Sequence, residues 1–372
     1  MSKLDNLIEK LCPDGVKFEE LKEICMVSIG EFVHKNKQRE DAKYPVFNGG
    51  ISNTGFYDEY NNEGNKILIS ARGANAGFIN KIESRYWAGN SCYSIDIKDK
   101  GSINWLYVYY YLKNNEKRLL GQQQTGSIPA ISKKQIESFK IPVPPLEVQC
   151  EIVHILDDFT LLSAELSAEL KARQKQYEFY SKNLFDFNDE VDWVNLEFIA
   201  EIGTGSSNTN EAVENGKYPF YVRSQQVYYK NDYEYDDNSI ITSGDGVGVG
   251  KIFHYTNGKY ALHQRAYRIH IIDSKVNSKY FYYYMKSTFY DYIQKNAFNS
   301  SVTSIRRPML NKYPIPVPSL EKQNKVVDIL DRFDKLCNDI SQGLPAEIEV
   351  RQKQYEYYRD KLLTFKELKV NE

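Results

Sequence analysis

Apolar residues recur at helical spacing in two long segments of the chain. In the first, from about 146 to 184, most apolar positions follow one another at steps of three or four: Ile152, Ile155, Phe159, Leu162, Leu166, Leu170, Tyr177, Tyr180 and Leu184. The second segment has similar spacing at Val326, Ile329, Phe333, Leu336, Ile340, Leu344, Ile348, Tyr355, Tyr358 and Leu362. Such steps bring the side chains onto one helical face, as in a coiled coil. We expect two long helices that pair antiparallel and hold the globular parts apart.

The two helical segments belong to an internal repeat. IPVPPLEVQCEIVHILDDF at Ile141 is answered by IPVPSLEKQNKVVDILDRF at Ile315, and RQKQYEFY at Arg173 by RQKQYEYY at Arg351. The offset is 174 residues for the first pair of blocks and 178 for the second, so the second copy contains four more residues. Because Gly343 and Pro345 fall in this longer stretch, we expect a kink or a brief break there.

The repeat extends through the rest of the chain. Three further pairs of matching runs lie at nearly the same offset: KYP at Lys43 and Lys217, YVYYYLK at Tyr107 and YFYYYMK at Tyr280, and GSIPAIS at Gly126 and SSVTSIR at Ser300. The variable parts, about 12–140 and 188–314, contain short β-like runs between Gly and Asn turns, and one helix each, at about 103–114 and 278–295. We predict an α+β fold in which two similar α/β domains are separated by two long antiparallel coiled-coil helices, with an internal pseudo-twofold repeat.

Composition narrows the class of protein without pointing to nucleic acid. The 372 residues carry a net charge of −2, so binding to a polyanion requires basic residues gathered on particular faces. No apolar run approaches the roughly 20 residues of a membrane-spanning helix. The five cysteines are scattered and form no CxxC pair, which favours reduced thiols in a cytoplasmic protein and disfavours structural zinc. Most of the 30 tyrosines fall in the variable parts, where core and rim packing is a simpler role for them than base stacking.

Motifs for catalysis or metal binding are absent from the sequence. SGDGVGVGK at Ser243 fails as a phosphate loop, because Asp245 stands where a glycine is required and Ile252 follows the lysine. Pro13–Asp14 with Glu20 and Lys22 loosely resembles a metal-nuclease signature, but we place these residues in an amphipathic helix. The histidines lack metal-ligand spacing, and there is no cofactor loop of a methyltransferase. We therefore predict no catalytic residue and no metal ligand.

The variable parts differ most in their polar loops. Residues 48–50 (Asn, Gly, Gly) correspond to 222–224 (Val, Arg, Ser), and residues 90–92 (Asn, Ser, Cys) to 263–265 (His, Gln, Arg). Residues 122–125 correspond to 296–299, and Lys133 and Lys134 to the basic pair Arg306 and Arg307. Such side chains suit base edges and phosphates, although surface loops are polar in most proteins. Two similar domains with unlike loops suggest a reader of two unlike half-sites.

The repeated IPVPPLE segment, the ARQKQYEFYSKNL stretch and the two variable domains resemble the specificity subunit of type I restriction–modification systems. The resemblance covers essentially the whole chain. It implies target-recognition domain 1 at 1–140, a central helical spacer at 141–187, target-recognition domain 2 at 188–314 and a C-terminal helical spacer at 315–372. In that family the two domains read the halves of a bipartite, asymmetric site in double-stranded DNA.

The resemblance also implies partners and cofactors. The helical regions of the family dock two methyltransferase (modification) subunits, and restriction/translocase subunits then join. Chemistry belongs to these partners, which use S-adenosylmethionine, ATP and Mg²⁺, so no cofactor is expected on this chain. Carried over by position, the residues expected to serve helix packing and subunit docking are Leu146, Glu147, Gln149, Ile152, Ile155 and Leu156, with Leu320, Glu321, Gln323, Ile329 and Leu330.

Base-contacting residues do not follow from the resemblance, because the family varies at those positions. Our candidates come from loop placement. In the first domain they are Asn48, Arg72, Asn75, Asn90, Gln122, Gln124, Thr125, Ser127, Lys133 and Lys134. In the second they are Arg223, Gln225, Lys251, His263, Gln264, Arg265, Thr303, Arg306 and Arg307. Two alternatives remain open at this point: a coiled-coil scaffold that never touches DNA, and a stand-alone DNA-modifying enzyme.

Overall fold

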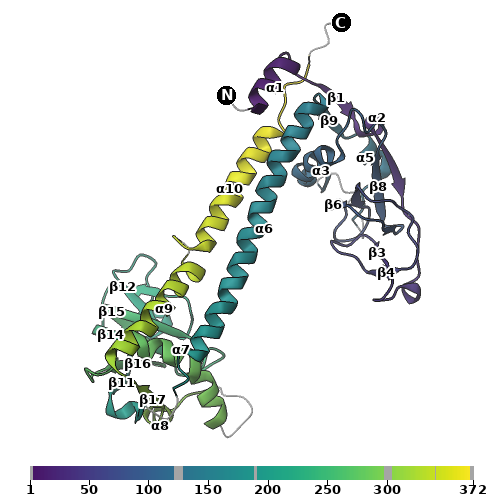
Figure 1. Ribbon diagram of the computed structural model, residues 1–372. Coiled ribbons are helices and arrows are strands. Elements are labelled where there is room, and N and C mark those ends of the chain that lie inside the picture. The colour runs from purple at the N-terminus through teal and green to yellow at the C-terminus, as the bar shows by residue number, and fades with distance from the viewer. Residues whose placement is uncertain (1–2, 121–128, 188–190, 297–303, 340, 369–372) are drawn as a thin grey trace. The chain divides into compact units, whose positions relative to one another are not determined.

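The computed structural model describes residues 3–120, 129–187, 191–296, 304–339 and 341–368 (Figure 1). The chain divides into two compact units. Unit 1 comprises Met1–Glu165 and Glu349–Glu372, and unit 2 comprises Leu166–Ile348. Each unit holds one globular domain together with parts of the long helices. Within the described ranges, no helix is both long and apolar enough to cross a membrane.

The core of unit 1 is an antiparallel sheet covered by a tyrosine-rich helix. The sheet has the strand order β2 (Cys25–Ile29), β8 (Cys92–Ile97), β5 (Lys66–Ser70), β6 (Ile79–Ile82). A smaller sheet has the order β4 (Gly55–Tyr57), β3 (Tyr44–Phe47), β7 (Trp87–Ala88). Helix α3 (Trp105–Asn114) packs on the large sheet, and the Tyr107 hydroxyl donates to the Pro142 carbonyl over 3.0 Å. The predicted helix at about 103–114 is thus confirmed, and its tyrosines serve the core.

Shorter elements complete unit 1. The helices are α1 (Lys3–Leu11), α2 (Leu21–Ile24), α4 (Glu116–Leu120) and α5 (Lys133–Glu137), with a 3₁₀ turn η1 (Lys35–Lys37). Strand β1 (Lys17–Glu20) pairs antiparallel with β9 (Lys140–Val143), which leads into the long helix. The amphipathic helix expected around Pro13–Asp14 and Glu20 is therefore wrong. Pro13 and Asp14 lie in a turn, and Lys17–Glu20 pairs with β9, an extended partner that the spacing of these residues does not reveal.

Unit 2 repeats this architecture with one large sheet. Its strand order is β11 (Ala200–Thr204), β16 (Ala266–Ile271), β14 (Tyr235–Ser243), β15 (Phe253–Leu262), β12 (Tyr218–Tyr221), β13 (Tyr228–Lys230). Strand β10 (Asp192–Asn195) pairs with β17 (Pro314–Val317). The remaining elements are α7 (Ser278–Asn296), α8 (Arg307–Asn311), η2 (Leu196–Phe198) and η3 (Thr209–Glu211). Because β15 spans the region that unit 1 divides between β6 and β7, two sheets of unit 1 become one in unit 2.

The long helices pair within each unit. Helix α6 runs unbroken from Leu146 to Asn183. In unit 1 its first half packs against α10 (Leu344–Leu362), where the rings of Phe159 and Tyr358 stack with centroids 5.7 Å apart. In unit 2 its second half packs against α9 (Leu320–Asn338), where Phe333 lies 5.6 Å from the ring of Tyr180. The helices run antiparallel in both units (Figure 1), as predicted.

The second helical segment breaks where the sequence predicts. Helix α9 ends at Asn338 and α10 begins at Leu344. The Asp339 carboxylate accepts from the backbone N–H of Ser341 (2.7 Å) and of Gln342 (3.1 Å), and the Gly343 N–H donates to the Asp339 carbonyl. A Cβ on Gly343 would lie 2.6 Å from the Lys335 carbonyl oxygen. Glycine is therefore required at this point by close backbone approach.

Candidate nucleic-acid recognition loops

Three loops of unit 2 meet at one carboxylate. Asp245, which follows β14, accepts a hydrogen bond from Nη1 of Arg223 (2.6 Å) and another from Nη1 of Arg265 (3.2 Å). Arg223 follows β12, and Arg265 lies in the turn before β16. Burial works to raise the pKa of the Asp245 carboxyl, but the hydrogen bonds and charges of the two arginines outweigh it, so the pKa lies below its ordinary value. Asp245 is therefore a carboxylate at neutral pH.

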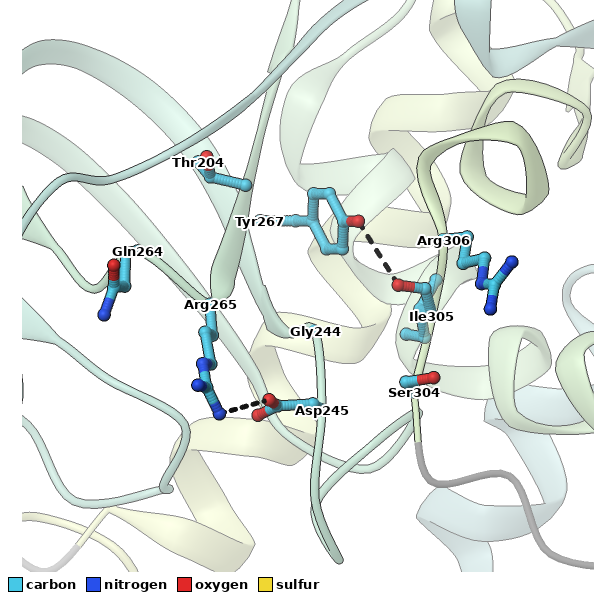
Figure 2. Close-up of a pocket in the computed structure, with 9 residues that line it drawn as sticks. All are labelled: Thr204, Gly244, Asp245, Gln264, Arg265, Tyr267, Ser304, Ile305 and Arg306. Carbon is cyan, nitrogen blue, oxygen red and sulfur yellow. Dashed lines mark hydrogen bonds and ion pairs between the residues drawn. The ribbon is translucent and has the colours of Figure 1, made fainter.

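A shallow hollow of about 320 Å³ lies beside this carboxylate. Figure 2 shows Asp245 and Arg265 on one side of it and the strand-like stretch 304–306 on the other. The Tyr267 hydroxyl donates to the Ile305 carbonyl over 3.2 Å, and the Ile305 N–H donates to the Gly244 carbonyl over 2.8 Å. These bonds tie the segment before α8 to the loop after β14. Hydrogen bonds to the backbone therefore connect the two sides of the hollow, and the charged residues Asp245, Arg265 and Arg306 line it.

His263 supports the turn that carries Arg265. Its Nδ1 accepts from the Arg265 backbone N–H over 3.0 Å, and the backbone N–H of His263 donates to the Tyr221 carbonyl over 2.9 Å. Burial, aided by the positive charge of Arg223, lowers the pKa of His263 below its ordinary value, although Asp245 opposes the shift. A neutral ring is required for Nδ1 to accept a hydrogen bond. His263, a predicted DNA contact, is buried, and its side chain stabilises the turn that carries Arg265.

The other predicted residues of unit 2 have different environments. Arg306 is the N-cap of α8 and makes no capping bond with its side chain, and Arg307 is the first helical residue; both are exposed. Lys251 lies with its ammonium 5.0 Å from the ring centroid of Tyr290. Gln225 is exposed in the same turn as Arg223. Thr303 lies outside the described residues.

The equivalent loops of unit 1 also meet. The Gly49 N–H donates to Sγ of Cys92 over 3.0 Å, and a Cβ on Gly49, where φ is +82°, would lie 3.1 Å from the Arg72 carbonyl oxygen and 3.2 Å from the Ser91 Cβ. Asn48 is close enough that its Oδ1 would be 2.5 Å from a Cβ on Gly89. Asn48, Arg72 and Asn90 are exposed at the loop surface, and Asn75 is half-buried.

The remaining candidates of the first domain fall into two groups. Lys133 and Lys134 are exposed on α5, where Lys133 pairs with Glu137 over 3.5 Å. The other four, Gln122, Gln124, Thr125 and Ser127, lie outside the described residues.

Strand register corrects two of the correspondences read from the sequence. Cys92 pairs with Ser70 in unit 1 as Ala266 pairs with Ser243 in unit 2, so Ser91 corresponds to Arg265 and Asn90 to Gln264. The predicted correspondence of residues 90–92 with 263–265 is therefore wrong by one position, because unit 2 has one extra residue between β14 and β16. Ser132 and Arg306 are the N-caps of α5 and α8, so these two residues are equivalent in the repeat, and Lys133 is equivalent to Arg307.

With this register the two loop clusters carry different charges at equivalent points. Arg72 and Asp245 form equivalent isolated bridges, to Ala130 and Ser304 respectively. Where unit 1 has Gly49 and Ser91, unit 2 has Arg223 and Arg265. A single arginine is thus replaced by a carboxylate between two arginines. Asp245 is not among the predicted residues, because the candidates were cationic or neutral polar side chains; its equivalence to Arg72 in the repeat was a usable signal.

The helical residues predicted for docking divide sharply by burial. The side chain of Gln149 is fully buried: its Oε1 accepts from the Asn104 N–H over 2.8 Å, and its Nε2 donates to the carbonyls of Ser102 and Pro144. Gln323 makes the equivalent bonds to Asn277, Lys275 and Pro318. Three apolar residues of the set, Ile152, Leu156 and Leu330, are also fully buried within their own units. These five side chains pack the unit internally.

The rest of the docking set is at least partly accessible. Glu147, Leu320, Glu321 and Ile329 are exposed, and Leu146 and Ile155 are half-buried. A partner protein could contact these residues and not the buried five. Across the described ranges, no group of three or more His, Cys, Asp and Glu side chains is arranged to hold a metal ion.

Comparison with known proteins identifies relatives for both halves. The family model of the type I restriction modification DNA specificity domain matches residues 13–173 and again 188–350. The specificity subunit of the EcoR124I/EcoR124II type I restriction enzyme from Escherichia coli is 35% identical over 289 residues, covering 70% of this chain and 70% of that protein. A putative type I restriction enzyme specificity subunit from Haemophilus influenzae is 29% identical over 361 residues, covering 89% of this chain and 90% of its own length.

Solved structures show the same fold. The S subunit of a type I restriction–modification system from M. genitalium superposes with a TM-score of 0.67 at 18% identity, covering 94% of this chain and 96% of that chain. A structure concerned with complex assembly and conformational transition of the type I system has a TM-score of 0.60 at 13% identity, covering 95% and 98%. Since the family model matches both halves and spans most of the sequence, the chain belongs to the family of type I restriction–modification specificity subunits.

Proposed function

We propose that this chain is the non-catalytic subunit that selects the DNA sequence acted on by a type I restriction–modification complex. Each globular domain reads one half of a bipartite, asymmetric site in double-stranded DNA. The observation that carries this proposal is the pair of equivalent loop clusters with unlike side chains, Arg72 in unit 1 and Arg223–Asp245–Arg265 in unit 2. A shared frame with different polar groups suits two different base sequences.

The long helices support a role in assembly. Exposed positions on the first turns of α6 and α9, among them Glu147 and Leu320, offer surfaces for two methyltransferase (modification) subunits, one for each copy of the repeat. Restriction/translocase subunits would join through these partners. S-adenosylmethionine, ATP and Mg²⁺ would be held by the partner subunits, and the reaction chemistry would take place there in a cytoplasmic complex.

The test is methylome sequencing of a host that co-expresses this chain with its modification subunit. We expect a single bipartite motif whose two specified halves flank a degenerate gap. Replacing residues 188–314 with the corresponding segment of another specificity subunit should change one half of the motif and leave the other half unchanged. The same swap at 12–140 should have the converse effect and serves as the matched control.

Two results would contradict the proposal in different ways. A stable complex with the modification subunit but no methylated motif would favour a scaffold that does not read DNA. Methylation by the purified chain alone, with S-adenosylmethionine supplied, would favour a stand-alone modifying enzyme. Either result leaves the fold and the family unchanged.

A further inference from the structure

We propose that the cluster of Arg223, Asp245 and Arg265 reads a G·C base pair within the half-site of unit 2, with Asp245 as the positioning residue that holds both arginines. This inference rests on the proposed function. It adds the identity of one base pair and the residues that select it.

The first argument is the geometry of the cluster. Asp245 engages one nitrogen, Nη1, of each arginine, at 2.6 Å for Arg223 and 3.2 Å for Arg265. A guanidinium has five N–H donors, so each arginine keeps donors for a second partner. The Arg265 side chain is 60% exposed and that of Arg223 40%, while Asp245 is only 27% exposed. The carboxylate lies at the base of the cluster and the arginines extend outward from it.

The second argument is the chemistry of the base edge. Guanine presents two neighbouring acceptors, N7 and O6, in the major groove, whereas adenine presents one acceptor and one donor. A guanidinium offers donors only. A guanidinium held in one orientation can therefore donate to both acceptors of guanine, whereas the donor of adenine faces it without a partner. Arginines fixed by a carboxylate behind them therefore select the guanine of a G·C pair.

The third argument separates base reading from phosphate binding. A phosphate contact carries no sequence information directly. It also disfavours a neighbouring carboxylate, because Asp245 would repel the phosphate charge. Arg306 and Arg307 contrast with the cluster, since within the described residues no carboxylate lies in ion-pair distance of either. We therefore assign Arg306 and Arg307 to phosphate contacts, and Arg223 and Arg265, which Asp245 holds, to base contacts.

Unit 1 provides an internal comparison. At the points equivalent to Arg223, Asp245 and Arg265 it carries Gly49, Arg72 and Ser91. These three points of unit 1 therefore hold one arginine and no carboxylate. The two units share the backbone bonds that place these loops: the Ala71 N–H donates to Ser91 O over 2.7 Å and the Gly244 N–H to Arg265 O over 2.9 Å. The side chains at these three points differ between the units. A variant of Asp245 should therefore alter unit 2 reading and leave unit 1 reading intact.

The experiment uses the co-expressed complex of the chain with its modification subunit. Asp245→Asn keeps the size of the side chain and removes its charge, and Arg265→Ala removes one reader. We expect both variants to accept other bases at one G·C position of one half-site, with discrimination reduced about 5- to 150-fold. Asp236→Asn, which removes the charge of an exposed carboxylate on β14, the strand that precedes Asp245, is the matched control and should leave the motif unchanged.

Binding to modified oligonucleotides supplies a second readout. Replacing each guanine of the site in turn with 7-deazaguanine removes the N7 acceptor. We expect one position in the half read by unit 2 at which the wild-type complex loses affinity and the Arg265→Ala complex does not lose any further. Thermal unfolding of each variant shows whether the fold of unit 2 has survived, and a variant that unfolds early is replaced by Arg265→Gln.

The outcomes separate this inference from the proposed function. A wild-type motif whose unit 2 half lacks any G·C pair would overturn the inference while the proposed function stands. Equal loss of affinity on every DNA, with the motif unchanged in Asp245→Asn, would also overturn it and would assign the cluster to the phosphate backbone. Absence of any motif in the wild type would instead refute the proposed function itself.

Discussion

Gln149 and Gln323 stand 174 residues apart and make the same three hydrogen bonds in their respective units. Each accepts from the N–H of an asparagine that begins a tyrosine-rich helix, Asn104 over 2.8 Å and Asn277 over 2.8 Å. Each also donates to two carbonyls, one in the preceding loop and one in the proline-rich turn that leads into its own helix. A fully buried side chain thus ties the recognition domain of each unit to its long helix.

Replacing either glutamine with alanine should destabilise its own unit. Gln149→Ala leaves one donor and two acceptors without partners in the protein interior, which costs about 1–3 kcal/mol for an unsatisfied group. We expect the Asn104 amide to exchange faster by hydrogen–deuterium exchange in this variant, and the Asn277 amide to do so in Gln323→Ala. The exposed neighbours Glu147→Ala and Glu321→Ala are controls. Equal exchange in variant and wild type would show that the bonds are not formed in solution.

Arg306→Ala should weaken DNA binding without changing the motif. Its guanidinium is exposed, and no capping hydrogen bond fixes the side chain, so we infer that Arg306 contacts a DNA phosphate. Loss of one phosphate contact should lower the slope of log K against log salt by about 0.9, to a similar extent on specific and unrelated DNA. Salt titrations by fluorescence anisotropy measure this, with Lys322→Ala on α9 as the control. A change confined to one base position would instead make Arg306 a base reader.

Acid should destabilise unit 2 before unit 1. Burial lowers the pKa of His254 and of His263 below the ordinary value of 6.5, so the unfolded chain binds protons more readily than the folded unit. The stability contributed by these neutral rings is present above pH 6.5 and is lost as the pH falls below it. Hydrogen exchange at pH 7.5 and 5.5 should show protection lost first in β12, β15 and the turn before β16. His254→Gln should reduce the difference, and equal loss in both units would contradict the assignment.

Cys150 should be the fast-reacting thiol of the native protein. It is exposed on α6, whereas Cys12, Cys25, Cys92 and Cys337 are buried. Burial also raises the pKa of Cys25 to about 12 and that of Cys92 to about 11, which keeps both as poorly nucleophilic thiols. Titration with a chromogenic disulfide should give one rapid equivalent and four slow ones. Cys150→Ser should remove the rapid phase, and a rapid phase that persists would mean that a buried site opens.

The sequence by itself determined the repeat, the fold class and the long helices. Steps of three and four residues report a helical face locally, which is why α6 and the break between α9 and α10 were predictable from spacing and from Gly343. The short β-like runs between Gly and Asn turns, among them KILIS and CYSIDI, became strands such as β5 and β8. These features depend on neighbours in the chain, and sequence records neighbours directly.

Tertiary structure alone decided which polar residues meet. Asp245 lies 22 and 20 residues from Arg223 and Arg265, and no periodicity links the three loops that bring them together. The one-residue slip between Ser91 and Arg265 became visible only through strand pairing, because register is fixed by hydrogen bonds across the sheet. Burial of Gln149, a polar residue expected to dock a partner, likewise depends on acceptors and donors supplied by a distant loop. A recognition site of this kind is built from long-range contacts, whose composition the sequence contains but whose geometry the fold creates.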